Sequence, residues 1–137
     1  IKSTQDCQNI MFLPFQELNA LSDWLNTGDI HIIPQDEEID NLLFPSKLHA
    51  ILASGNPIVC NVKKESDLGK IVEVAGIRVD PKDQIGFING LDKLIKDEKL
   101  RLDLGYKARQ FANKNYNKEL ILEKFEKFIS KSTSKEN

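Results

Sequence analysis

A lysine stands near the start of an expected helix, where a positive charge is unusual. In the stretch "LLFPSKLHAILASGNPIVC", Pro45 and Gly55 predict a helix between them, because proline is favoured at the first helical position and glycine just past the last. Lys47 then lies in the first turn, where the helix dipole already supplies positive potential. Backbone N–H groups, the Ser46 hydroxyl and the Lys47 ammonium together at one helix end would bind an anion such as phosphate. The alternative is a lysine that extends into water and binds nothing.

Acidic residues precede this helix. The segment "QDEEIDNLLF" (Gln35 to Phe44) follows an expected strand and contains Asp36, Glu37, Glu38 and Asp40. Open α/β sheets bind ligands at the carboxyl ends of their strands, so this loop lies where a site is expected. Paired carboxylates there could serve catalysis or hold a metal ion, but no histidine or third ligand stands at metal-binding spacing. The interpretation that we favour is a solvated loop that holds no metal.

The histidines and cysteines give no catalytic pattern. His31 lies within an expected strand and His49 one turn into the expected helix, and each is interpreted as a hydrogen-bonded structural residue rather than an acid–base group. Cys7 and Cys60 form no C-x-x-C pair, so neither a zinc site nor a disulfide framework is indicated. Cys60 ends an apolar run and is expected to be a core thiol. The chain has no G-x-S-x-G, Walker or H-E-x-x-H motif.

Short apolar segments alternate with helical patterns in the first part of the chain. The expected strands are Asn9–Phe15, Ile30–Pro34, Pro57–Val62 and Gly76–Asp80. The expected helices between them are Glu17–Asn26, the helix from Pro45 to Gly55, and Ser66–Ala75. This alternation predicts an α/β fold: a doubly wound, Rossmann-like parallel sheet with helices on both faces.

The pattern changes to helices alone after Asp80. Three apolar stripes at helical spacing follow, the first begun by Asp80 or Asp83 with Pro81 and the last capped by Asn117. The end of the chain is polar and lacks periodicity, which predicts a frayed tail. We therefore expect one domain over residues 1–130 and a disordered tail over residues 131–137.

The composition is that of a soluble globular protein. Of 137 residues, 40% are hydrophobic and 29% charged, and the net charge is −2, which gives no indication of a nucleic-acid partner. The charge is uneven, with net −6 over residues 1–90 and +4 over residues 91–137; the basic excess on helices is interpreted as solvated surface rather than a partner-binding or membrane-surface patch. No apolar stretch approaches the length of a spanning helix, and no leader pattern precedes the domain, which predicts a cytoplasmic location.

The predicted sheet is narrow, and its first edge is exposed. A nucleotide-binding doubly wound domain usually begins with a strand and a glycine-rich turn, but this chain has no G-x-G. An exposed edge strand is normally covered or paired. We therefore expect the start of the domain to be missing, so that the chain is a fragment.

Three segments carry a family resemblance. Together "NIMFLPFQELNALSDWLNTGDIHIIPQ", "FPSKLHAILASGNPIVC" and "AGIRVDPKD" resemble the carboxy-terminal nucleotide-sugar-binding half of retaining glycosyltransferases of family 4, in particular the bacterial colanic-acid and capsular-polysaccharide type. The resemblance extends through the final helices and covers nearly the whole chain. It implies a hexosyltransferase-type enzyme of the two-domain GT-B architecture. This half would hold the donor and an amino-terminal half would hold the acceptor, so this fragment alone should be inactive.

The resemblance also implies roles for individual residues. The helix near Pro45 would face the donor pyrophosphate, with Ser46 and Lys47 at that position and Leu43, Phe44, Pro45 and Leu48 lining the donor and phosphate site. Lys47 would be catalytic, stabilising the departing diphosphate electrostatically. The donor nucleoside-diphosphate sugar is a substrate, and no metal or other cofactor is required if the protein supplies the positive charge.

The resemblance leaves the nucleotide open. Many members carry two glutamates separated by seven residues, the second of which binds the ribose; the corresponding residues here are Leu42 and Ala50. Recognition of the ribose by this helix is therefore in doubt, and UDP and GDP donors stay equally open. The implied acceptor is a growing, lipid-linked glycan, which suggests peripheral association with the inner face of the plasma membrane.

Two other classes remain open. A sugar-nucleotide epimerase of the same architecture would need paired carboxylates and a histidine near the sugar, which only the acidic loop with His31 or His49 could supply. A non-catalytic phosphoryl-binding domain of the response-regulator kind would need an acidic cluster after its first strand, where only Glu17 is near.

Overall fold

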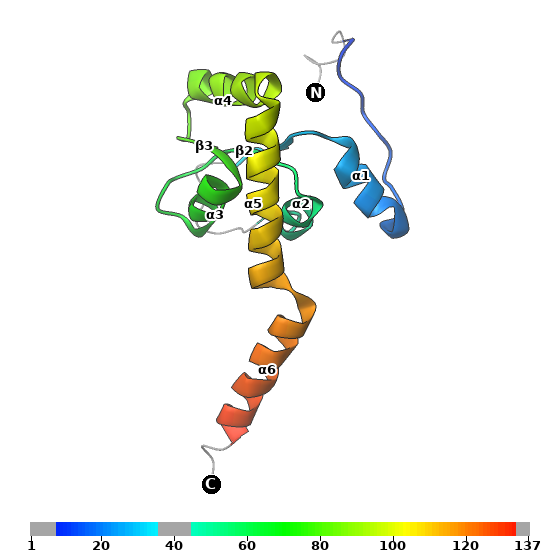
Figure 1. The fold of residues 1–137 in the computed structure, drawn as a ribbon, viewed down its shortest axis with the longest axis vertical. Helices are drawn as coiled ribbons and strands as arrows, with labels where there is room; N and C mark the ends of the chain where they lie inside the picture. The colour runs from blue at the N-terminus through cyan, green and yellow to red at the C-terminus, as the bar shows by residue number, and fades with distance from the viewer. Residues whose placement is uncertain (1–7, 36–44, 134–137) are drawn as a thin grey trace.

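A computed structural model of the chain describes residues 8–35 and 45–133. It is an α/β domain in which three short strands precede three consecutive helices (Figure 1). The elements are η2 (Leu18–Ala20), α1 (Leu21–Thr27), β1 (His31–Ile33), α2 (Leu48–Ser54), β2 (Ile58–Asn61), α3 (Asp67–Ala75), β3 (Gly76–Val79), α4 (Gln84–Lys96), α5 (Glu98–Tyr116) and α6 (Lys118–Thr133).

The described strands form one parallel sheet in the order β1-β2-β3. His31 pairs with Ile58, and Ile58 pairs in turn with Gly76. Successive side chains of a strand point to opposite faces, and here both faces are buried. Ile58 and Cys60 belong to a core covered by α2, α3 and α5. Val59 belongs to a second core, covered by α4 and the first turns of α5. The predicted parallel sheet with helices on both faces is therefore confirmed.

Helix α5 packs closely against the end of α2. Gly55, directly after α2, has a φ of 79°, in the left-handed region that glycine adopts without strain. Gly105 of α5 faces it so closely that a Cβ there would lie 2.0 Å from the Gly55 carbonyl oxygen. Gly105 is therefore needed for the close approach of the two helices, and Gly55 for its backbone conformation. Gly55 is confirmed as the residue that ends this helix.

The strand expected over Asn9–Phe15 is wrong. These residues form no strand, and the side chains of Met11 and Phe12 are 79% and 72% exposed. Among the described residues β1 pairs with β2 and no strand lies on its other side. Strand propensity needs a neighbouring strand to be realised, because an isolated strand leaves its backbone groups unpaired.

The helix expected to begin at Pro45 begins three residues later. The Leu48 N–H donates to the Pro45 carbonyl oxygen at 3.0 Å, so residues 45–47 form a turn. The first α-helical bond runs from the Ile51 N–H to the Lys47 carbonyl oxygen at 3.0 Å. Lys47 is therefore the residue that precedes the helix, rather than a member of its first turn. The preceding helix is also divided, into the short turn η2 and then α1.

The three helices expected after Asp80 are confirmed. Of the two aspartates considered for the first of them, Asp83 caps α4 by accepting from the Gly86 N–H at 2.8 Å. The Asn117 side chain caps α6, accepting from the Glu119 N–H at 2.9 Å. Helix α6 extends to Thr133, into the segment predicted as a tail, and residues 134–137 lie outside the described part. No helix among the described residues is both long and apolar enough to cross a membrane.

Strand β3 carries a half-buried arginine that ties three elements together. The Arg78 guanidinium donates to the Asp80 carboxylate at 2.5 Å and to the Val62 carbonyl oxygen at 3.1 Å. It also forms an ion pair with Glu73 of α3, at 3.4 Å. The hydrogen bond that Arg78 donates to Asp80, with the negative charges of Asp80 and Glu73, outweighs the effect of burial and raises the pKa of Arg78. The side chain therefore stays charged and anchors β3 to α3.

Candidate ligand-binding site

A cavity of about 500 Å³ lies at the carboxyl ends of the strands. Its lining residues come from the ends of β1 and β2 and from the beginning of α4: Pro34, Asn61, Lys82, Asp83, Gln84, Phe87 and Ile88. Phe87 and Ile88 supply an apolar wall, and amide, ammonium and carboxylate groups stand around it. Open parallel sheets bind ligands at this edge.

Asn61 holds the beginning of the acidic loop at this edge. Its side-chain amide donates to the Gln35 carbonyl oxygen at 2.8 Å and accepts from the Gln35 N–H at 3.1 Å. Gln35 lies two residues beyond the end of β1. The Asn61 side chain bonds its backbone in the way that the backbone of a neighbouring strand would. This pair of bonds fixes where the chain leaves the sheet after β1.

The turn into α4 has an unusual backbone conformation. Lys82 has a φ of 68°, which among the described residues no other non-glycine residue shares. Such conformations cost free energy and occur often at functional sites. The turn is closed by the Asp83 N–H, which donates to the Asp80 carbonyl oxygen at 3.1 Å. It places Lys82 and Asp83 side by side in the lining of the cavity.

The amino end of α4 does not favour an anion. The Asp83 carboxylate already accepts the Gly86 N–H, so a negative charge occupies the position that a phosphate would take. Gly86 belongs to this arrangement, because a Cβ there would lie 2.2 Å from the Asp83 Oδ2. An anionic group at this edge of the sheet would therefore need a different source of positive charge.

The predicted phosphate-binding residues lie at the amino end of α2, toward the same edge of the sheet, because the other end of α2 leads through Gly55 to the amino end of β2. Ser46 and Lys47 are exposed, and neither lines the cavity described above. Leu48 is fully buried in the core, so only its backbone could approach a ligand. Pro45 is half-buried, and Leu43 and Phe44 lie outside the described residues.

The later start of α2 leaves less positive potential at its amino end than the sequence predicts. With Pro45 accepting the Leu48 N–H, one N–H group that was expected to be available is already used. The helix has only 7 residues, so its dipole is short. The Lys47 ammonium is then the principal positive group that the described residues place here.

His31 is held by hydrogen bonds, as expected, and His49 packs against a tyrosine ring. A ring nitrogen of His31 lies 3.1 Å from the Leu25 carbonyl oxygen and 3.5 Å from the Ser54 hydroxyl. Burial lowers the pKa of His31 more than the bond with Leu25 raises it. His31 is the first residue of β1, at the edge opposite the cavity, and the His49 ring packs edge-on against Tyr116 with ring centres 4.2 Å apart. His31 is therefore away from a ligand at the carboxyl edge, whereas His49 is exposed in the first turn of α2, two residues after Lys47.

These positions weaken both alternatives. The epimerase needs a histidine beside the sugar, and His31 is at the opposite edge of the sheet, which leaves only His49; its acidic residues Asp36, Glu37, Glu38 and Asp40 lie outside the described residues. The response-regulator-like domain needs a first strand before Glu17, and the structure has none there. Cys60 is a fully buried core residue, as expected.

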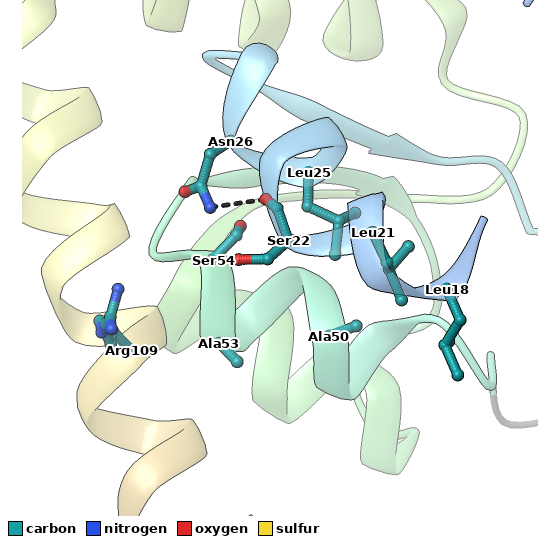
Figure 2. A pocket seen from close by; sticks show the side chains of 9 residues that line it. All are labelled: Leu18, Leu21, Ser22, Leu25, Asn26, Ala50, Ala53, Ser54 and Arg109. Atoms are coloured by element: carbon teal, nitrogen blue, oxygen red, sulfur yellow. Dashed lines mark hydrogen bonds between the residues drawn. The ribbon is translucent and has the colours of Figure 1, made fainter. Parts of the chain in front are cut away.

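A second cavity, of about 350 Å³, lies between α1 and α2 with Arg109 of α5 at one end (Figure 2). Leucines of η2 and α1 face small residues of α2, and the Asn26 side chain donates to the Ser22 carbonyl oxygen at 2.7 Å. Ser54, in its lining, ends α2 on the side where β2 begins. This cavity is therefore away from the carboxyl ends of the strands, and we interpret it as a groove between helices.

The chain is similar to a curated bacterial protein. No protein-family model matches the chain, and no solved structure matches it. Among curated proteins, the chain is 28% identical over 121 residues to the putative colanic acid biosynthesis glycosyl transferase WcaI of Escherichia coli K12. The match covers 86% of this chain and 29% of that relative. The chain is related to a glycosyltransferase.

Sequence reasoning missed the residues that line the cavity. The expected strand Pro57–Val62 includes Asn61, which the structure confirms as the last residue of β2, but the sequence analysis gives Asn61 no role in a site. Asp83 was considered only as a cap, and Lys82 and Phe87 were not considered at all. Their proximity depends on the turn at Lys82, which no residue type in the sequence indicates.

Proposed function

We propose that the chain is the donor-binding half of a retaining glycosyltransferase of the GT-B architecture. It would act with an amino-terminal half that holds the acceptor, and transfer a sugar from a nucleoside-diphosphate donor to a hydroxyl of a growing exopolysaccharide. The observation that carries the proposal is the similarity to a glycosyltransferase over 86% of the chain. The parallel sheet, with its cavity at the carboxyl edge, supports it.

In the proposed complex the donor diphosphate lies beside Ser46 and Lys47. When the bond between the sugar carbon and the diphosphate oxygen breaks, negative charge grows on the departing diphosphate. The Lys47 ammonium stabilises that charge more in the transition state than in the ground state, which accelerates transfer. The acceptor oxygen then forms the new bond on the same face of the sugar, and its proton passes to the departing diphosphate oxygen. The proposed chemistry uses protein charges and requires no metal.

The cavity beside α4 is proposed to receive the nucleoside. Phe87 and Ile88 offer an apolar wall to a base, and Asn61 and Gln84 offer hydrogen-bonding groups. A volume of about 500 Å³ is in the range of small-molecule sites. The Asp83 carboxylate keeps the diphosphate away from the amino end of α4, which favours its binding at Lys47.

Calorimetric titration of the chain with UDP and with GDP tests donor binding. The proposal predicts saturable binding of at least one of them, weakened in Lys47→Ala and unchanged in Lys114→Ala, a matched exposed lysine on α5. Absence of binding of both diphosphates at millimolar concentration, in a sample shown to be folded, would contradict it.

In the intact enzyme, Lys47→Ala should lower the transfer rate by roughly a hundredfold, as is typical for loss of one group that stabilises a transition state. Lys114→Ala is again the control. A change of less than about twofold would show that Lys47 is a surface lysine without a catalytic role.

A further inference from the structure

The cavity beside α4 has a carboxylate in its lining, which restricts the groups that it can bind. Lys82 and Asp83 both line it, brought there by the turn in which Lys82 has a φ of 68°. The amides of Asn61 and Gln84 and the ring of Phe87 complete the part of the lining that concerns a base. A ligand group in this cavity therefore meets a negative and a positive charge side by side, next to an aromatic ring.

The lining groups differ in what they have left to offer a ligand. The Asn61 amide already uses its oxygen and its nitrogen on the backbone of Gln35. Asp83 uses Oδ1, which accepts the Gly86 N–H at 2.8 Å. No hydrogen bond reaches Asp83 Oδ2 from the part of the chain that the structure describes. Because an ionised carboxylate accepts and never donates, Asp83 still needs hydrogen-bond donors.

The common bases differ in the donors that they can present to a carboxylate. Guanine carries two adjacent donors on its Watson–Crick edge, the ring N1–H and the 2-amino group. Uracil carries one N–H between two carbonyl oxygens, which a carboxylate repels. Adenine and cytosine place a ring-nitrogen acceptor beside their amino group, which is again unfavourable. Guanine is therefore the base whose donors match the two oxygens of one carboxylate, and such charge-assisted bonds are the strong ones.

We infer that this cavity is a guanine site, that the donor is a guanosine-diphosphate sugar, and that Asp83 is the residue that selects the base. The inference rests on the proposed function, because it requires a nucleoside in the cavity. The Asp83 carboxylate accepts from the N1–H and the 2-amino group, the ring system lies along Phe87, and the Lys82 ammonium faces the guanine O6. The negative charge that excludes the diphosphate from the amino end of α4 is then the same charge that selects the base.

Calorimetric titration of the chain with GDP, UDP and inosine diphosphate tests the choice of base. Inosine diphosphate differs from GDP only in lacking the 2-amino group. A hydrogen bond to a charged group typically contributes enough for GDP to bind roughly tenfold more tightly than inosine diphosphate, and UDP should bind more weakly still. UDP bound as tightly as GDP would overturn the guanine inference and leave the proposed function standing. Absence of binding of all three would overturn both.

The substitution Asp83→Asn tests the residue without removing the cap of α4. Asparagine caps helices as well as aspartate does, so its oxygen can keep the Gly86 N–H, while an NH2 donor replaces the other oxygen. The variant should bind GDP roughly tenfold more weakly than the natural chain does. It should gain affinity for xanthosine diphosphate, in which a carbonyl oxygen replaces the 2-amino group and accepts from the new donor.

Asp97→Asn is the matched control. Asp97 caps α5 by accepting from the Leu100 N–H at 2.9 Å, and it does not line the cavity. This variant should bind GDP as the natural chain does, and circular dichroism should show equal helix content in all three chains. An equal loss of GDP affinity in both variants would overturn the role of Asp83, as would an unchanged preference for GDP over xanthosine diphosphate in Asp83→Asn.

Discussion

Replacing Gly105 by alanine should destabilise the domain, although alanine is the better helix former. A Cβ at this position would lie 2.0 Å from the Gly55 carbonyl oxygen, whereas ordinary contacts of a Cβ begin at 3.4 Å. Helix α5 would have to move away from α2 by about 1.4 Å, the difference between these distances. The movement would loosen the packing of Ala108 and Ala112, which are buried one and two turns further along.

The size of the effect follows from two opposed contributions. Alanine in a helix interior gains up to about 1 kcal/mol over glycine. Overpacking a well-packed contact costs about 1–3 kcal/mol, and more when backbone must move. Because the clash here is with a backbone oxygen, we expect a net loss of about 2 kcal/mol in the free energy of unfolding, and a fall in Tm of about 5–10 °C.

Urea unfolding followed by circular dichroism measures the change. Gly28→Ala is the matched control, because its Cβ would lie 3.9 Å from the nearest atom, the Ile30 carbonyl oxygen, and its φ is −97°. The control should unfold within about 0.5 kcal/mol of the natural chain. If Gly105→Ala were as stable as the natural chain, or more stable, the described contact between α5 and α2 would be refuted.

Three further results are expected. His31→Gln should remove a pH dependence of stability, because the pKa of His31 is lower in the folded chain than its ordinary value of 6.5. The contribution of His31 to the free energy of unfolding is therefore complete above about pH 6.5 and is lost as the pH falls through the folded pKa. Unfolding measured at several pH values tests this. Asn61→Ala should speed amide hydrogen exchange at Gln35 by at least tenfold, since it removes both bonds that hold that backbone; unchanged exchange would argue against the clamp. Arg78→Met should lower the free energy of unfolding by about 1–2 kcal/mol in urea titrations, because it removes the bond to the Val62 carbonyl oxygen and two partly solvated ion pairs; no loss would show that these contacts contribute nothing.

The fold could be predicted from the sequence where hydrophobic pattern and end signals agree. The strand around Val59 and the helix after Ser66 have both, and the structure places them within a residue of expectation. The segment Asn9–Phe15 has the pattern alone, and a pattern does not supply the neighbouring strand that a strand requires. At Pro45 the end signal was misleading, because a proline can begin a turn before a helix as readily as the helix itself.

The candidate site could be predicted only in part. The carboxyl edge of the sheet follows from the parallel alternation, and Lys47 lies at that edge. The wall of the cavity depends on the direction of α4 relative to β2. The turn at Lys82 and the Asp83 cap set this direction, and the hydrophobic periodicity of the sequence does not indicate it. Lys47 keeps its proposed role for an electrostatic reason, although it precedes α2 and the helix dipole that it accompanies is short.

Amide chemical-shift mapping of the isotopically labelled chain with UDP and GDP tests the central claim most directly, because it locates the nucleotide as well as detecting it. The account predicts saturable shifts at the amides of Ser46 and Lys47 and around Asn61 and Phe87, and none along α6. Shifts confined to the groove around Arg109, or absent from the carboxyl edge of the sheet at saturating nucleotide, would contradict it.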